Sequence, residues 1–351
     1  MQHYLDRNNV SGEIHRLIVE NNIKNILLVC GNSFFKLNVY EKIKDVSRAD
    51  SVKVVVFSEF SVNPDLEEAE KAASVYGDSK CNLIIGAGGG SAIDVAKYVA
   101  IKQEALFMAI PTTAGTGSEA TPFAVLYEHG EKTSISNPKG LASYVLLDGE
   151  NVRSLPDRHK IATMCDALSH AVEAIWSVNA TDESIDYSKK AIRMIEEYRE
   201  QYLESETKAL QGMIEAANLS GKAIAIARTT ASHAMAYKLT KRYGLAHGEA
   251  VMMTLPNISE FLSNNSDKQV SDKMRILRDA FGVDDDCTVV KKLENYRELI
   301  SPDLPKEISS QEIDDLCESV NLERLANFPV LLRKEDTRKI YEDALMINVR
   351  L

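Results

Sequence analysis

The sequence predicts two domains, an α/β domain built on a parallel sheet and then an all-helical domain. Three observations support this prediction. The chain has 351 residues, which is long for one compact core. Short apolar runs alternate with helical patterns in its first half. From about Leu155, long segments repeat apolar residues at the spacing of a helix. We therefore expect the α/β domain over residues 1–154 and the helical domain over residues 155–351.

Apolar runs followed by turn residues predict the strands of the first domain. They cover residues 25–30, 52–57, 82–87 and 105–110, with a last strand at 143–148. Helical patterns cover residues 66–76 and 91–100, and two short runs around residues 128–131 indicate a hairpin. Strands that alternate with helices in this way are typical of a parallel sheet covered by helices.

Long helical patterns dominate the second half, at residues 182–203, 207–227 and 274–281. We expect Leu155, Pro156 and Asp157 to form the hinge between the two domains. Pro156 is expected to open a helix, because proline is well suited to the start of one. We expect the acidic segment 283–305 to be a solvated connection between helices.

The composition narrows the class of function. A net charge of −11 disfavours a nucleic-acid partner but leaves room for a small anionic ligand. No apolar run is long enough for a bilayer and the N-terminus lacks the apolar core of a signal peptide, so we expect a cytoplasmic protein without a membrane partner. The five cysteines are scattered, which indicates reduced, mostly buried thiols.

Two loops follow neighbouring strands and point to a nucleotide. In IIGAGGGSAIDVAK, glycines let a ligand approach the backbone, and the amides at the following helix start attract a phosphate. The dinucleotide pattern GxGxxG is broken, because Ser91 stands at its last position. The loop IPTTAGTGSEAT adds hydroxyls and further glycines. Such neighbouring loops form the ligand crevice of an open α/β sheet. The alternative is a tight turn in one loop and hydroxyl caps in the other.

Three of the seven histidines, His170, His233 and His247, are candidate metal ligands. The other four, at positions 3, 15, 129 and 159, lie in polar settings and are expected at the surface. Asp166 and His170 are four residues apart and share one helix face. Imidazole and carboxylate groups bind Zn²⁺ or Fe²⁺. The alternative is a histidine satisfied in the core or at a cap, and His247 could close a helix because Gly248 follows it.

Four stretches together resemble the iron-containing alcohol dehydrogenase family. They are GGGSAIDVAK, PTTAGTGSEAT, SLPDRHKIATMCDALSHAVEA and SHAMAYKLTKRYGLAHGEAV, in this order and in both halves of the chain. The resemblance implies a nucleotide-binding α/β domain and a helical metal-binding domain, the fold shared with dehydroquinate synthase. It also implies an active site in the cleft between the domains and a homodimer.

The resemblance assigns the ligands of two cofactors. The family's metal ligands fall on Asp166, His170, His233 and His247, with Fe²⁺ favoured and Zn²⁺ as the alternative. Residues for NADPH or NADH fall on Gly31, Gly88, Gly89, Gly90, Ser91, Asp94, Lys97, Thr112, Thr113, Thr116 and Ser118. For Lys97, a solvated place on the helix face is the alternative.

Two positions depart from the family pattern. Gly31 stands where many members have an aspartate that holds the adenosine ribose and repels a 2′-phosphate, which favours NADPH. A plain turn glycine is the alternative. Tyr237 stands four residues after His233, where alcohol-oxidising relatives often carry a histidine. We expect Tyr237 to be a catalytic residue that donates a proton or hydrogen-bonds the substrate.

The function implied by the resemblance is that of a metal-dependent, NAD(P)H-linked alcohol dehydrogenase or aldehyde reductase. Hydride would pass to a carbonyl that the metal polarises. Arg228, Thr229 and Thr230 precede His233 and form a candidate site for an anionic substrate group. The alternative is a solvated arginine. The RTTxxHAMxY pattern resembles the phosphonoacetaldehyde reductase branch, which makes 2-hydroxyethylphosphonate.

Three other functions remain open. A general aldehyde reductase with a neutral substrate would not need Arg228. A lyase or cyclase of the dehydroquinate synthase type would use a different ligand pattern, usually with a glutamate. A metal-free nucleotide-binding protein would have no reason to retain all four metal ligands.

Overall fold

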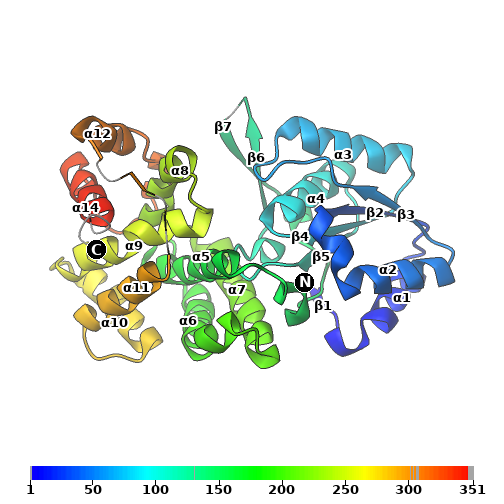
Figure 1. Ribbon diagram of the computed structural model, residues 1–351, viewed down its shortest axis with the longest axis horizontal. Coiled ribbons are helices and arrows are strands. Elements are labelled where there is room, and N and C mark those ends of the chain that lie inside the picture. Colours follow the sequence, from blue (N-terminus) through cyan, green and yellow to red (C-terminus); the bar gives the residue numbers. More distant parts are fainter. Residues whose placement is uncertain (1, 130, 301, 303, 306–307, 347–351) are drawn as a thin grey trace. The chain divides into compact units, whose positions relative to one another are not determined.

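The computed structural model of the protein describes residues 2–129, 131–300, 302, 304–305 and 308–346. The chain divides into two compact units, residues 1–154 and 155–351. Figure 1 shows strands and helices in the first unit and helices in the second.

The first unit is built on a six-stranded sheet in the order β1-β8-β5-β4-β2-β3, in which every neighbouring pair is parallel. This confirms the predicted parallel sheet. Its strands are β1 (His3–Tyr4), β2 (Asn25–Cys30), β3 (Lys53–Phe57), β4 (Leu83–Gly88), β5 (Phe107–Pro111) and β8 (Tyr144–Val145). The predicted hairpin is also present, as the antiparallel pair β6 (Phe123–Glu128) and β7 (Glu131–Ser136).

Helices cover both faces of this sheet. The helices α1 (Val10–Glu20) and α2 (Asn38–Ala49) lie on one face, and α3 (Leu66–Asp78) and α4 (Gly90–Gln103) lie on the other (Figure 1). Buried side chains of α1 and α2 form one apolar cluster with the sheet, and those of α3 and α4 form another. The strand β2 contributes side chains to both faces, because successive residues of a strand point to opposite sides. Leu27 and Val29 pack with α3 and α4, and Leu28 packs with α1 and α2. A strand buried on both faces reads as a continuous apolar run, which is why NILLVC could be recognised.

The second unit surrounds one buried helix, α5 (Asp157–Trp176), in which every residue from Met164 to Trp176 is buried. Its neighbours include α6 (Asp182–Leu203), α7 (Thr207–Ala227), α9 (His247–Ser263) and α10 (Lys268–Phe281). The other helices are α8 (Ala231–Tyr243), α11 (Asp286–Glu298), α12 (Ser310–Glu318), α13 (Leu322–Leu325) and α14 (Lys334–Met346). Pro156 is the N-cap of α5, which confirms that it stands at the start of a helix.

Two predictions about this fold are wrong. The segment expected to be a solvated connection contains α11, whose Val289, Leu293 and Tyr296 are buried against the rest of the unit. These residues are four and then three apart, which is the spacing of one helix face, and the acidic residues around them hid it. Residues 301, 303, 306 and 307 of that segment lie outside the described residues. The last strand is shorter than predicted, because β8 pairs with only two residues of β1.

Within the described part of the chain, no helix has both the length and the apolarity needed to cross a membrane.

Candidate metal centre and nucleotide-binding loops

The helix α5 supplies the first two candidate metal ligands. Asp166 and His170 are one turn apart, so both side chains leave the same face of the helix. The Nε2 atom of His170 lies 3.7 Å from Oδ1 of Asp166, and both side chains are buried. A carboxylate and an imidazole are thus held together on one buried face of α5.

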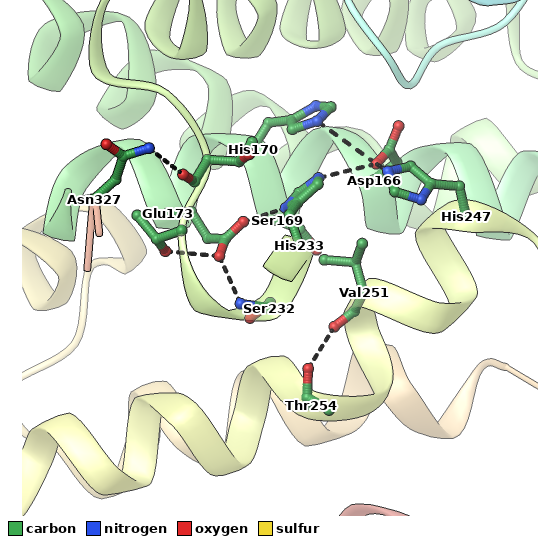
Figure 2. Close-up of polar contacts among 12 residues, drawn as sticks. Asp166, Ser169, His170, Glu173, Ser232, His233, His247, Val251, Thr254 and Asn327 are labelled. Carbon is green, nitrogen blue, oxygen red and sulfur yellow. Dashed lines mark hydrogen bonds and ion pairs between the residues drawn. The ribbon is translucent and has the colours of Figure 1, made fainter. Parts of the chain in front are cut away.

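His233 and His247 reach the same carboxylate from two other helices. His233 stands in the first turn of α8, with Nε2 3.7 Å from Asp166 Oδ1. His247 is the first residue of α9, with Nε2 3.9 Å from the same oxygen. One ligand atom from each of Asp166, His233 and His247 lies within 4.8 Å of the others. His170 lies outside this group of three, but its ring stacks on that of His233 at 4.7 Å between centroids. Figure 2 shows all four side chains converging.

The atoms at the centre of this cluster lack ordinary partners. Asp166 Oδ1 and His233 Nε2 are buried, and neither has a hydrogen bond within the described part of the chain. Their separation of 3.7 Å is too long for one. Buried polar atoms are rarely left in this state, since each costs about 1–3 kcal/mol. A divalent cation would satisfy both atoms together with His247, so the residues present fit a metal ion.

The protonation states also suit a cation. Burial lowers the pKa of His170 to about 4, so its imidazole is neutral at pH 7 and has a lone pair to offer. Burial by itself would raise the pKa of Asp166, but the histidines around the carboxylate, His170 first, outweigh burial and keep this pKa below its usual value. For His233, burial is the largest single influence and opposes the charged form, but Glu173 and Asp166 together outweigh burial and raise the pKa. A cation at Nε2 would therefore replace a proton there.

Two contacts hold His247 in place at the start of α9. A Cβ atom on Gly248 would lie 1.9 Å from the backbone oxygen of Ala162 and 2.9 Å from Cβ of Asp166, so α9 packs directly against α5 here. The Glu249 carboxylate accepts a hydrogen bond from the Ala246 amide at 2.8 Å. It also accepts two hydrogen bonds from the Arg158 guanidinium, at 2.8 and 2.9 Å. His247 therefore begins a helix, and the alternative in which it closes one is wrong.

Glu173 is a member of this cluster that the sequence reasoning missed. It is fully buried on α5, one turn after His170, and its Oε2 is bonded to Nδ1 of His233. Its Oε1 accepts from the Thr230 hydroxyl at 2.7 Å and from the Ser232 amide at 2.8 Å (Figure 2). The signal was present in DALSHAVEA, where Glu173 follows His170 by three residues and so lies on the helix face that carries Asp166 and His170.

The candidate substrate residues occupy different environments. Arg228 is exposed and ends α7 with φ 66° and ψ 166°, a conformation that is almost restricted to glycine. Burial of part of the side chain lowers the pKa of its guanidinium. Thr229 is half-buried, and its carbonyl accepts from Asn327 at 3.1 Å. Thr230 is fully buried with its hydroxyl bonded to Glu173, so it supports the metal cluster. Tyr237 is half-buried on α8, one turn after His233.

In the first unit, the two candidate nucleotide loops touch each other. They follow β4 and β5, which are neighbours, and the Thr112 amide donates to the Gly88 carbonyl at 2.9 Å. A Cβ atom on Gly89 would lie 3.4 Å from the Thr113 side chain, and one on Gly90 would lie 3.2 Å from that of Thr116. Ser91 and Asp94 follow in the first turns of α4. The structure therefore brings these predicted cofactor residues together at the carboxyl edge of the sheet.

Lys97 and Asp94 of α4 bond to the threonine-rich loop that follows β5 and hold it in place. Lys97 is fully buried, and its ammonium donates to Ser118 Oγ at 2.7 Å, Thr121 Oγ1 at 2.9 Å and the Phe123 carbonyl at 2.6 Å. Burial lowers the pKa of Lys97 to about 8. Asp94 accepts from the Ser118 hydroxyl at 2.6 Å. The solvated alternative for Lys97 is therefore wrong, and its three donors are used within the protein.

Gly31 follows β2 at the same edge of the sheet. Its φ of −80° is accessible to any residue, and a Cβ atom placed on it would meet nothing within 4 Å. Neither the backbone conformation nor the packing requires glycine at this position. An aspartate could stand here without strain, so the local structure does not explain why it is absent.

Comparisons with known proteins agree across both units. The family model described as "Iron-containing alcohol dehydrogenase" matches residues 2–149. The model described as "Fe-containing alcohol dehydrogenase family, C-terminal" matches residues 160–344. Together these matches include every candidate metal and nucleotide residue named above.

Individual relatives point the same way. Long-chain-alcohol dehydrogenase 1 of Geobacillus thermodenitrificans is 30% identical over 355 aligned positions, which cover 92% of this chain and 89% of the relative. Phosphonoacetaldehyde reductase of Streptomyces viridochromogenes is 39% identical over 158 positions, 44% of this chain and 40% of the relative. A solved iron-containing alcohol dehydrogenase from Thermotoga maritima matches with a TM-score of 0.83 and 28% identity over 98% of each chain. This chain therefore belongs to the iron-containing alcohol dehydrogenase family.

Proposed function

We propose that this protein is a metal-dependent, NAD(P)H-linked aldehyde reductase that also runs in reverse as an alcohol dehydrogenase. The observation that carries the proposal is the convergence of His170, His233 and His247 on one oxygen of Asp166. Two of the central atoms lack a hydrogen bond within the described residues. A cation is the simplest group that satisfies a carboxylate oxygen and imidazole nitrogens at once.

Each side chain has a role in this proposal. Asp166, His170, His233 and His247 hold the metal, for which Fe²⁺ is favoured and Zn²⁺ is the alternative. When bound, the metal supplies a Lewis acid that polarises a carbonyl. Tyr237 lies on α8 one turn after His233, and its hydroxyl provides a proton to the product oxygen.

The first unit binds the reduced nicotinamide cofactor in this proposal. The glycine turn and the threonine loop receive the pyrophosphate, since the turn leads directly into the N-terminus of α4. NADPH is favoured over NADH because Gly31 offers no negative charge near the ribose. Lys97 and Asp94 act on the cofactor through the loop that they brace.

The substrate is proposed to be a small aldehyde with an anionic group, such as phosphonoacetaldehyde. Arg228 and Thr229 would bind the anion, and the strained backbone of Arg228 supports this because such strain gathers at functional sites. The 39% identity to a phosphonoacetaldehyde reductase over 44% of the chain is further support.

The first experiment follows NADPH consumption by the Fe²⁺-loaded protein, with phosphonoacetaldehyde and a neutral aldehyde of similar size side by side. A large preference for the phosphonate supports the anionic substrate. Equal turnover supports a general aldehyde reductase. A protein that binds no divalent metal would leave only the nucleotide-binding alternative.

The remaining expectations from the sequence are a homodimer and a cytoplasmic location, and both stay predictions. Light scattering on the purified protein tests the first, and cell fractionation tests the second.

A further inference from the structure

Glu173 accepts three hydrogen bonds although no solvent reaches it. Its Oε1 receives the Thr230 hydroxyl at 2.7 Å and the Ser232 amide at 2.8 Å, and its Oε2 is bonded to Nδ1 of His233. Figure 2 shows this carboxylate on the side of the His233 ring away from Asp166. The imidazole therefore lies between two carboxylates, one at each of its nitrogens.

The direction of each proton in this network is set by groups that can only donate. The indole Nε1 of Trp176 donates to the Thr230 oxygen at 2.7 Å. The Thr230 hydroxyl accepts that bond and gives its own proton to Glu173. The Ser232 amide is also an obligate donor, in the first turn of α8, where helical amides lack partners in their own helix. Oε1 is thus filled by two donors, and Oε2 is left to accept from His233.

We propose that Glu173 is a positioning residue that selects the tautomer of His233. Because Glu173 accepts the Nδ1 proton, Nε2 is the nitrogen whose lone pair is available to a metal, and it faces Asp166, where it has no hydrogen bond in the described structure. A carboxylate behind a ligating imidazole fixes the orientation of the ring and strengthens its ligand atom. This inference rests on the metal site proposed above and adds Glu173, Thr230 and Trp176 to it.

The substitution Glu173→Gln tests this idea with almost no change in shape. The glutamine carbonyl oxygen must face Thr230 and Ser232, because both donate. Its amide nitrogen then faces Nδ1 of His233 and donates to it. That bond places the imidazole proton on Nε2, the atom that should bind the metal. Metal affinity should therefore fall even though packing is preserved.

The experiment measures Zn²⁺ binding by calorimetry and the visible absorption of the Co²⁺-loaded protein. Glu173→Gln is expected to weaken Zn²⁺ binding by about 10–100-fold and to alter the Co²⁺ spectrum. Glu196→Gln is the matched control, because Glu196 is also a glutamate of the helical unit and bonds to Tyr296 and Lys292 instead. This control should bind Zn²⁺ like the wild type.

A second pair of variants covers the case in which Glu173→Gln does not fold. Thr230→Val removes the hydroxyl that holds Oε1, and Thr230→Ser keeps it. Zn²⁺ affinity should fall in the valine variant and remain in the serine variant.

The outcomes separate this inference from the proposed function. Wild-type protein that binds no divalent metal would overturn both. Wild-type protein that binds Zn²⁺, together with unchanged affinity in Glu173→Gln and Thr230→Val, would overturn the role of Glu173 alone.

Discussion

The backbone oxygen of Ala162 lies so close to Gly248 that a Cβ atom built on Gly248 would be only 1.9 Å from it. This contact sets the distance between α5 and the start of α9. His247 is the residue next to Gly248, so the same contact sets how closely that imidazole approaches Asp166.

Gly248→Ala should therefore damage the metal site through the backbone. The added methyl group must move α9 away from α5, and overpacking of this kind costs about 1–3 kcal/mol. A ligand displaced by an ångström can lower kcat/KM by about 10²-fold. Calorimetry with Zn²⁺ and steady-state kinetics check this prediction. Gly77→Ala in α3 is the control, since its methyl group meets nothing within 4 Å and should leave binding unchanged. Wild-type Zn²⁺ affinity in Gly248→Ala would refute the prediction.

His247→Ala should abolish turnover without unfolding the protein. The His247 side chain is 41% exposed, so its loss leaves no buried cavity, and His170 and His233 remain beside the Asp166 carboxylate. The metal-free variant should match the metal-free wild type within about 0.5 kcal/mol in its free energy of unfolding. Only the wild type should gain stability from metal, about 2.7 kcal/mol at a concentration 100 times the Kd. His159→Ala, another exposed histidine of the helical unit, is the control. Retained activity in His247→Ala would remove it from the ligand set.

Replacing Arg228 with glycine should raise the stability of the protein and weaken its binding of an anionic substrate. Its backbone conformation suits glycine, and such strain costs about 1–3 kcal/mol in a non-glycine residue. Arg228→Gly relieves the strain but gives the unfolded chain more freedom, a cost of about 0.5–1 kcal/mol. We expect a net gain of about 1 kcal/mol on thermal unfolding, from the difference between these terms.

The effect of substitutions at Arg228 on substrate binding is measured by comparing an anionic aldehyde with a neutral one. Both Arg228→Gly and Arg228→Ala should raise KM for an anionic aldehyde much more than for a neutral one. Only the glycine variant should gain stability. Equal effects on the two aldehydes would exclude Arg228 from the anion site.

Gly31→Asp should shift the cofactor preference towards NADH. The side chain has room, because no atom lies within 4 Å of its Cβ position. A carboxylate near a 2′-phosphate would repel it by about 4 kcal/mol at 4 Å and an effective dielectric constant of 20, which is ample for a tenfold change. The ratio of kcat/KM for NADPH and NADH measures the shift. Gly31→Ala adds the Cβ atom without charge and should leave the ratio alone. An unchanged ratio in the aspartate variant would mean that the ribose is recognised elsewhere.

Local periodicity was enough to predict most elements. The strand β2 and the helices α6 and α7 have the predicted bounds, because an unbroken apolar run and a 3.6-residue repeat each depend on one segment only. The helix α11 was missed because it has few apolar residues among many charged ones, and only its packing shows which of them are buried. The two residues of β8 could not be bounded either, because the partner strand β1 lies at the other end of the unit's sequence.

The sequence by itself determined the family motifs, the parallel sheet, the helical second half and the residue types of a metal site. The tertiary structure alone decided that Glu173 lies behind His233, that Lys97 braces a loop, and that Gly248 permits the approach of α9 to α5. In the sequence, Glu173 is one more acidic residue in a helix and Gly248 one more glycine after a histidine. Their roles arise from contacts between segments about 60 to 90 residues apart, and a periodic pattern within one segment carries no information about such contacts.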